Sequence, residues 1–306
     1  MTITISNAYI ETFENNVRHL SQQMRSKLRG HVTEVNKQSE THNFDRLAAS
    51  SARQKTSARM VSPAGGDGSG AVGSTDGLVY SRRSTVIRTF DTGEVIEPEN
   101  LVQMLIDPKN ASTQNLVLNM MRQVDDIIIG AATADANDGA GGTVPFPASQ
   151  VVGNGTGEID IDTVLQVQEI FDSNDVDPDE TRCIVIGPKQ KRALMNLIQV
   201  TSNDFQAVKA LSTGYLPNFL GFDWVVSNRL NVPDTDQIDC LAFTPKAIGL
   251  HVAGDITSRV AERPDMSFAW QVYLMLHMDA VRVEDEHIVK LHLADTVTAP
   301  ITATPA

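Results

Sequence analysis

The chain has 306 residues, 41% of them hydrophobic, which is enough for a sizeable core and, on size alone, for about two domains. A net charge of −13 argues against a general nucleic-acid binder, and no apolar run approaches the roughly 18 residues that a membrane helix needs. Residues 1–90 carry 12 Lys and Arg against 7 Asp and Glu, whereas residues 91–306 carry 13 against 31. A basic front third and an acidic remainder suggest that one part docks on the other, within a molecule or between copies.

The N-terminus and the cysteines indicate the compartment. The first residues, MTITISNAYIETF, lack the basic-then-apolar pattern of a secretory signal. Cys183 and Cys240 fall in predicted strands and have no His or Cys at metal-ligand spacing. Both features are typical of a reduced cytoplasmic protein.

The first 45 residues predict an amphipathic helix and then a linker. Ser6 or Asn7 is a suitable N-cap, and basic residues stand near the end of the pattern, where a helix favours cations. The apolar face consists of Ile10, Phe13, Val17, Leu20, Met24 and Leu28. Two alternatives stay open: a helix that packs on its own domain, or an arm that finds its partner on a neighbouring chain. Residues 30–43 are polar and unpatterned, so we expect a linker there.

Residues 46–96 predict a long two-stranded excursion with a glycine-rich tip. The part up to residue 77 is rich in Gly, Ser and Ala and cannot bury a core of its own. A β-rich run follows, and Arg82, Arg83 and Arg88 punctuate it. Because an isolated two-stranded ribbon is only marginally stable in water, this segment needs a surface to lie on.

The most pronounced local pattern predicts one long helix over residues 107–136. Asp107 is a favourable N-cap, and Pro108 occupies the first helical position, where its missing N–H costs nothing. An apolar stripe follows at three- and four-residue intervals: Val117, Met120, Met121, Val124, Ile127, Ile128 and Ala131. Such a helix is roughly 35–40 Å long. The stripe therefore needs an equally long partner.

The second half alternates helices and strands. We expect helices over residues 161–171 and 188–198, with an apolar face in the first made of Ile161, Val164, Leu165, Val167 and Ile170. Expected strands cover residues 183–186, 224–227, 240–243 and 247–252, and residues 267–283 and 287–293 form two long strands of a terminal sheet. The Thr-, Pro- and Ala-rich tail is expected to be extended.

Two motifs match known sites only in part. Residues 68–73 read GSGAVG, which fits GxGxxG, but a strand does not precede them and a helix does not follow. The acidic run Asp172–Glu180 lacks the glycine and the final glutamate of an EF-hand loop when counted from Asp175. We therefore expect residues 68–73 to bind no nucleotide, and the acidic run to form a solvated turn.

Two groups of carboxylates are further candidates for chemistry. Residues 284–287 (EDEH) are the densest titratable group, but neighbours along a strand or turn point alternately, which favours a surface turn over a metal site. Asp125 and Asp126 are adjacent on the long helix and do not face each other, so we expect solvated or salt-bridged charges. The sequence therefore predicts no catalytic, cofactor-binding or metal-binding residues.

The order of these parts carries a resemblance. The arm and the Gly/Ser-rich excursion end in Ser81-Arg82-Arg83, an acidic connector (94–100) follows, and Leu105–Pro108 leads into the long helix with its Asp-Asp-Ile-Ile end. The second half contains RCIVIGP, GYLPNFLGFDWVVSNRL and SRVAERPDMSFAWQVYLMLHMDAVRVEDEHIVKLHL. This arrangement resembles the major capsid proteins of tailed bacteriophages, which have the Hong Kong 97-type fold, over residues 1 to about 295.

The resemblance implies an α+β fold with five parts. They are an N-terminal arm (1–45), an extended β-hairpin loop (46–95), a peripheral domain (96–159 and 256–295) with a spine helix at about 107–136, an axial domain (160–255) and a C-terminal tail (296–306). In the family, arm and extended loop lie across neighbouring subunits.

The implied function is a structural protein rather than an enzyme. It self-assembles as pentamers and hexamers into an icosahedral head that encloses double-stranded DNA. The expected inter-subunit contacts are Phe13, Val17, Leu20 and Met24 in the arm, and Arg82, Arg83 and Arg88, which would bind carboxylates of the next subunit. Some relatives weld subunits through a lysine near the loop tip, but residues 63–77 contain none, so we expect noncovalent interlocking.

The resemblance also implies partners and leaves alternatives. Because the chain begins almost at once with the arm, we expect a separate scaffolding protein, besides a portal and a decoration protein. DNA is expected only as enclosed cargo, with no membrane and no cofactor, and the protein is made in the bacterial host cytoplasm before it enters the virion. The alternatives are an encapsulin-like compartment shell and a metal-dependent enzyme using Glu284, Glu286 and His287.

Overall fold

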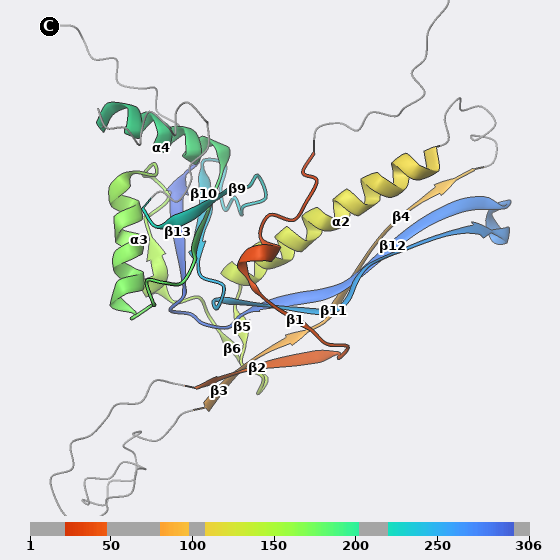
Figure 1. Ribbon diagram of the computed structural model, residues 1–306, viewed down its shortest axis with the longest axis horizontal. Helices are drawn as coiled ribbons and strands as arrows, with labels where there is room; N and C mark the ends of the chain where they lie inside the picture. Colours follow the sequence, from red (N-terminus) through yellow and green to blue (C-terminus); the bar gives the residue numbers. More distant parts are fainter. Residues whose placement is uncertain (1–21, 48–79, 98–107, 202–219, 297–306) are drawn as a thin grey trace, which may run out of the picture. The chain divides into compact units, whose positions relative to one another are not determined.

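The computed structural model describes residues 22–47, 80–97, 108–201 and 220–296 (Figure 1). The chain divides into two compact units. Unit 1 comprises residues 1–26, 89–123 and 254–277, and unit 2 comprises residues 27–88, 124–253 and 278–306. Helices and strands are both well represented, as the predicted α+β class requires.

A mixed five-stranded sheet forms the centre of unit 2, in the order β7-β13-β10-β8-β9. The strands are β7 (Val151–Val152), β8 (Arg182–Ile186), β9 (Phe222–Val226), β10 (Gln237–Phe243) and β13 (Ile288–Ala294). The middle strand β10 is antiparallel to both of its neighbours, and β8 pairs with β9 in parallel. Five consecutive residues of β8 are buried, which explains why this strand is recognisable as a continuous apolar run.

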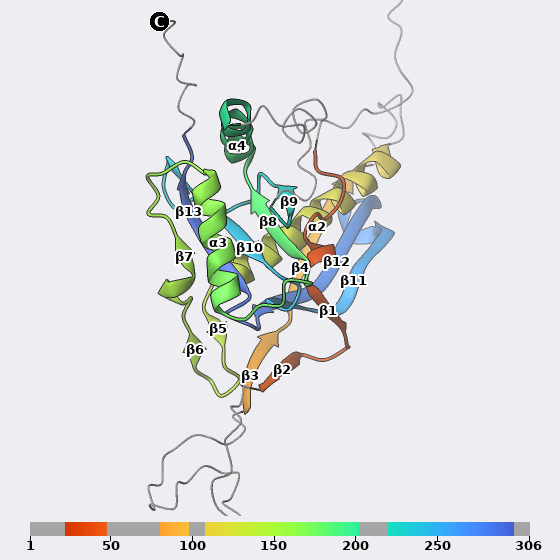
Figure 2. The same ribbon diagram turned by 60° about the vertical axis from the view of Figure 1, so that its left-hand side comes forward.

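Two helices accompany this sheet, α3 (Ile161–Ser173) and α4 (Pro188–Thr201). Asp160 caps α3 by accepting a 2.7 Å hydrogen bond from the Thr163 N–H. Val164, Val167 and Phe171 are buried, and α3 runs alongside the sheet in both views (Figures 1 and 2). Leu165 was expected on the apolar face but is 47% exposed, because it lies on the outer side of the helix.

The second sheet has the order β1-β11-β12-β4. Its strands are β1 (Thr33–Asn36), β4 (Arg88–Ile96), β11 (Ile248–Arg263) and β12 (Ala269–Arg282). β1 adds in parallel to the part of β11 that belongs to unit 2, with Thr33 opposite Gly249 and Val35 opposite His251. A separate two-stranded ribbon pairs β2 (Thr41–Leu47) with β3 (Tyr80–Val86) in antiparallel register.

The long helix is confirmed as α2 (Pro108–Thr133). It begins at the predicted proline and ends three residues before the predicted end, since Ala136–Asn137 form β5, which pairs with β6 (Thr143–Val144). Much of the predicted stripe is buried: Met120, Val124, Ile127 and Ile128. None of the described helices is long and apolar enough to cross a membrane.

The structure corrects the predictions for the front of the chain. Residues 22–28 are irregular rather than helical, and a short 3₁₀ helix, Arg29–His31, follows them. The predicted linker contains β1 and the start of β2. Its strands depend on backbone pairing with distant partners, so a polar sequence suffices. Phe13, Val17 and Leu20 lie outside the described residues.

The pairing of the later strands also differs from the prediction. β12 and β13 do not share a sheet, because β12 lies between β11 and β4 while β13 lies between β7 and β10. β4 likewise leaves the predicted excursion and joins the sheet of β12. β11 extends eleven residues beyond its predicted end at Val252, through a mostly exposed segment in which Ile256 and Val260 are the only large apolar residues.

Candidate functional site at the base of the ribbon

The ribbon base is the part of β2 and β3 that packs on the body of unit 2. β2 alternates strictly between exposed and half-buried residues, so His42, Phe44 and Arg46 share the inward face. The Phe44 ring lies so close to Gly249 on β11 that a Cβ there would stand 2.5 Å from it. Gly249 therefore provides the space in which the ribbon crosses β11.

Ion pairs connect both strands of the ribbon to the turn that follows β12. Arg46 Nη2 lies 2.9 Å from Glu284 Oε2, and Arg83 Nη2 lies 2.7 Å from Asp285 Oδ2. Asp285 also accepts a 2.6 Å hydrogen bond from Arg282 Nε. The Arg83 side chain is only 6% exposed, so its pair with Asp285 is shielded from water and from salt.

Arg282 is the largest fully buried side chain in the described part of the protein. It donates to the carbonyl oxygens of Ala134 at 2.6 Å, Val144 at 3.0 Å and Pro145 at 3.1 Å. Its guanidinium carbon lies 5.0 Å from the centre of the Phe146 ring. One guanidinium therefore joins the segment after α2, the strand β6 and the turn that holds the ribbon.

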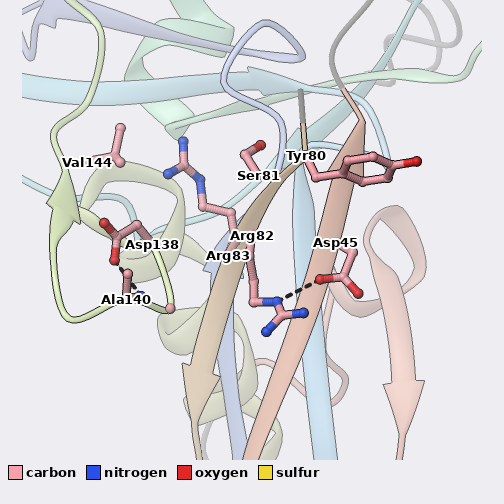
Figure 3. Close-up of a pocket in the computed structure, with 9 residues that line it drawn as sticks. Asp45, Tyr80, Ser81, Arg82, Arg83, Asp138, Ala140 and Val144 are labelled. Atoms are coloured by element: carbon pink, nitrogen blue, oxygen red, sulfur yellow. Dashed lines mark hydrogen bonds and ion pairs between the residues drawn. The ribbon is translucent and has the colours of Figure 1, made fainter. Parts of the chain in front are cut away.

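A hollow of about 800 Å³ lies beside the ribbon base (Figure 3). Its lining consists of Asp45, Tyr80, Ser81, Arg82, Arg83, Asp138, Gly139, Ala140 and Val144. Figure 3 shows the two arginines pointing in opposite directions from β3, with Arg82 Nε bound to Asp45 Oδ1 at 2.7 Å. Hydrogen bonds from the Ala140 and Gly142 N–H groups lower the pKa of Asp138. These charges already have partners, so the hollow offers a contact surface rather than a catalytic arrangement.

The three predicted contact arginines each have a carboxylate within their own chain. Arg88 pairs with Asp279 at 2.8 Å, while Arg82 and Arg83 make the pairs described above. The predicted contacts of these arginines with carboxylates of the next subunit are not tested by a single chain. Additional contacts between subunits stay a prediction, with most room at Arg82 and Arg88, whose side chains are 52% and 67% exposed. Met24, the one arm candidate within the described residues, is 69% exposed.

The titratable group 284–287 forms a turn between β12 and β13, as predicted. Its members serve separate partners: Glu284 binds Arg46, and His287 Nδ1 lies 2.8 Å from Thr244 Oγ1. Among the residues that the structure describes, no group of three or more His, Cys, Asp or Glu is placed to hold a metal ion. The metal-enzyme alternative thus gains no support from these residues. Their role as the anchor of the ribbon was missed, because their arginine partners lie 238 and 202 positions away in the sequence.

The two aspartates of α2 differ from each other. Asp125 is fully buried and accepts hydrogen bonds from the N–H groups of Lys27 at 3.1 Å and Leu28 at 3.2 Å. The sequence had suggested a solvated or salt-bridged charge. Asp125 instead fixes the backbone at the point where the N-terminal segment enters unit 2. Asp126 forms the expected salt bridge with Arg229, and the hydrogen bond between them raises the pKa of Arg229.

Both cysteines are buried, free thiols in the central sheet. Burial raises the pKa of Cys183 and of Cys240 to about 12. Since the thiolate is the reactive form, both side chains serve as packing groups.

A family model matches nearly the whole chain. Residues 5–295 match the family model described as phage capsid protein. The chain therefore belongs to this family of phage capsid proteins. A search of curated protein sequences found no match.

Solved capsid structures share the fold over nearly the entire chain. The capsid of Helicobacter pylori bacteriophage KHP30 matches with a TM-score of 0.70 at 11% identity, covering 96% of this chain and 98% of that one. The capsid of Ralstonia phage GP4 gives 0.69 at 10% identity with full coverage of both chains. Mycobacterium phage Che8 gives 0.63 at 16% identity, covering 94% and 97%. The fold is the Hong Kong 97-like fold of tailed-phage capsids, and the protein is a major capsid protein that forms the shell of the head.

Proposed function

We propose that the chain assembles as pentamers and hexamers into an icosahedral head around phage double-stranded DNA, held together by noncovalent interlocking of arm and extended loop. The observation that carries the proposal is the family match over residues 5–295. Obligate assembly interfaces bury thousands of Å². Modest contacts become strong when each copy grips several neighbours at once.

The ribbon base supports a role for the extended loop. Two ion pairs and the contact of Phe44 with Gly249 fix the inward face of the ribbon within its own subunit. The opposite face of β2 is exposed, as are Leu47 at 55% and Tyr80 at 72%. A ribbon that is fixed at its base and open along its outer face suits a contact with a neighbouring copy. Arg82, Arg88 and Met24 are the described residues that we expect at such contacts.

Partners and compartment follow from the same role. We propose that a separate scaffolding protein, a portal and a decoration protein act with the shell, which is assembled in the bacterial host cytoplasm. DNA is then enclosed cargo rather than a tightly bound ligand. The acidic remainder of the chain suits this, because its charge repels phosphates.

Electron microscopy of the purified full-length protein, combined with size-exclusion chromatography, tests the assembly. The expected result is closed shells with pentameric and hexameric clusters, and particles from infected cells should protect DNA against nuclease. Shells that hold a protein cargo instead of DNA would support the encapsulin-like alternative. A compact monomer at high concentration, with the arm and residues 48–79 resistant to proteases, would contradict the proposal.

A further inference from the structure

Two histidine rings face each other where the ribbon crosses β11. His42 lies on the inward face of β2, and its ring centre is 5.2 Å from that of His251. The rings are tilted by 39° to each other. His251 is fully buried, while His42 also contacts the Phe44 ring edge-on at 4.7 Å. The site thus places a half-buried histidine ring against a fully buried one.

The backbone of the β1–β2 corner holds the His251 ring. Its Nε2 lies 2.9 Å from the carbonyl oxygen of Lys37, an acceptor, so this nitrogen carries the proton and donates. Its Nδ1 is buried and has no hydrogen-bond partner. A proton gained by His42 would therefore place a charge against a fully buried ring, where water can solvate it only poorly.

Three titratable or charged groups act on His42. They are His251 on β11, which contacts its ring, Lys37 in the corner between β1 and β2, and Asp45 on the exposed face of β2. On the paired strand β3 the opposite residue is Thr85, which is neutral. Burial, His251 and Lys37 lower the pKa of His42, and only Asp45 acts in the opposite direction.

The two rings lie at the corner that joins β1, β2 and β3. Within this corner, residues 37–40, the Lys37 N–H donates to Val252 O at 3.1 Å. The Ile87 N–H, just beyond β3, donates to Glu40 O at 2.9 Å. The Lys37 carbonyl is the acceptor for His251, so a displacement of this ring acts on the residue whose N–H binds Val252.

We propose that His42, packed against the buried His251, acts as a proton-sensitive latch, which holds the β1–β2 corner and the ribbon base on β11 near neutral pH and loosens them in acid. The sign follows from linkage. His42 binds a proton less readily in the folded state than in the opened state, where the imidazole has its ordinary pKa of about 6.5. The contribution of the latch is complete above that value and is lost progressively as the pH falls below it. The latch is a property of the single chain and does not rest on shell assembly.

Hydrogen exchange of the full-length chain tests the latch. Protection factors, corrected for the intrinsic pH dependence of exchange, are measured at the Lys37 and Ile87 amides and compared with residues 238–243 of the central sheet. Between about pH 7.5 and pH 5, protection at the corner should fall several-fold relative to the sheet, because protonation of His42 favours the opened state.

Substitutions separate titration from packing. His42→Gln keeps hydrogen-bonding capacity without a titrating ring, and His251→Gln removes the ring that His42 contacts. Either substitution should abolish most of the pH-dependent loss. Lys37→Gln should reduce it, because it removes a charge that disfavours protonation. His277→Gln is the matched control, since this histidine lies on β12 and contacts Thr89 instead.

The outcomes are decisive even if one variant fails to fold. If His251→Gln does not fold, the test rests on His42→Gln alone, because His42 is only half-buried and its substitution is better tolerated. The latch would be overturned if the parent protein showed the same protection of the corner, relative to the sheet, at both pH values. It would also be overturned if His42→Gln lost as much protection in acid as the parent does. A loss that disappears equally in His277→Gln would place the effect elsewhere.

Discussion

The five-stranded sheet and the ribbon base belong to the same unit but are stabilised by different interactions. In the sheet, Ile184, Val185, Leu241 and Leu291 are fully buried apolar side chains. At the ribbon base the contacts are two ion pairs, the buried Arg282 and one aromatic ring against a glycine. Apolar burial is non-directional, whereas ion pairs and ring contacts need specific partners in specific positions.

This difference suits the two roles. A sheet that only has to be stable tolerates many apolar combinations of similar volume. A ribbon that has to reach a neighbour in a defined direction needs directional contacts at its base. We therefore expect substitutions in the sheet to change global stability, and substitutions at the base to change the placement of the ribbon as well.

The largest effect is expected from Arg282→Met. The substitution leaves three backbone carbonyls without their donor and deprives Asp285 of one of its two arginines. Breaking a buried charge network from one side costs about 3–5 kcal/mol. Urea denaturation of the unassembled chain measures the free energy of unfolding, and limited proteolysis reports on the ribbon. Arg282→Lys should not rescue either, because lysine lacks the planar fork; a loss under about 1 kcal/mol in Arg282→Met would refute the central role of this guanidinium.

Leu241→Ala tests the sheet side of the comparison. Leu241 is fully buried on the middle strand β10, and truncating such a leucine costs about 2–5 kcal/mol. The same urea experiment should show this loss with no change in protease cleavage at the ribbon under conditions where the chain stays folded. Selective exposure of the ribbon would show that sheet and base are not independent.

A third substitution, Gly249→Ala, should displace the ribbon. The new methyl group would stand 2.5 Å from the Phe44 ring, and overpacking of this kind costs about 1–3 kcal/mol. Phe44→Ala in the same chain removes the clash, so the double variant should be less destabilised than the sum of the single ones. Additive losses in the double-mutant cycle would rule out the proposed ring contact.

Arg82→Gln should have the smallest effect on stability. Arg82 and Asp45 have side chains that are 52% and 66% exposed, and exposed pairs contribute less than about 1 kcal/mol. If Arg82 also contacts a neighbouring subunit, the variant should form fewer shells by electron microscopy despite its normal stability. Arg192→Gln, an exposed arginine on α4, is the matched control. Shell yields equal to the parent would remove Arg82 from the predicted contacts.

Local pattern accounts for the elements that were predicted correctly. The start of α2 at Pro108, the helix α3 and the strands β8 and β10 each depend on periodicity, caps or a continuous apolar run within a few residues. The order of these parts along the chain also sufficed for the resemblance to phage capsid proteins, which the family match confirms.

Only the tertiary structure decided which strands pair and which charges meet. β1 is a polar tetrapeptide that is a strand because β11 offers its edge, and β12 and β13 separate into two sheets although they are neighbours in sequence. Asp125 can be buried because its carboxylate accepts hydrogen bonds from the N–H groups of Lys27 and Leu28. Arg83 and Arg282 both bind Asp285, although Arg83 is far from it in the sequence. Hydrogen bonds and ion pairs between distant residues leave no periodic trace in the sequence, whereas apolar burial against the protein interior does.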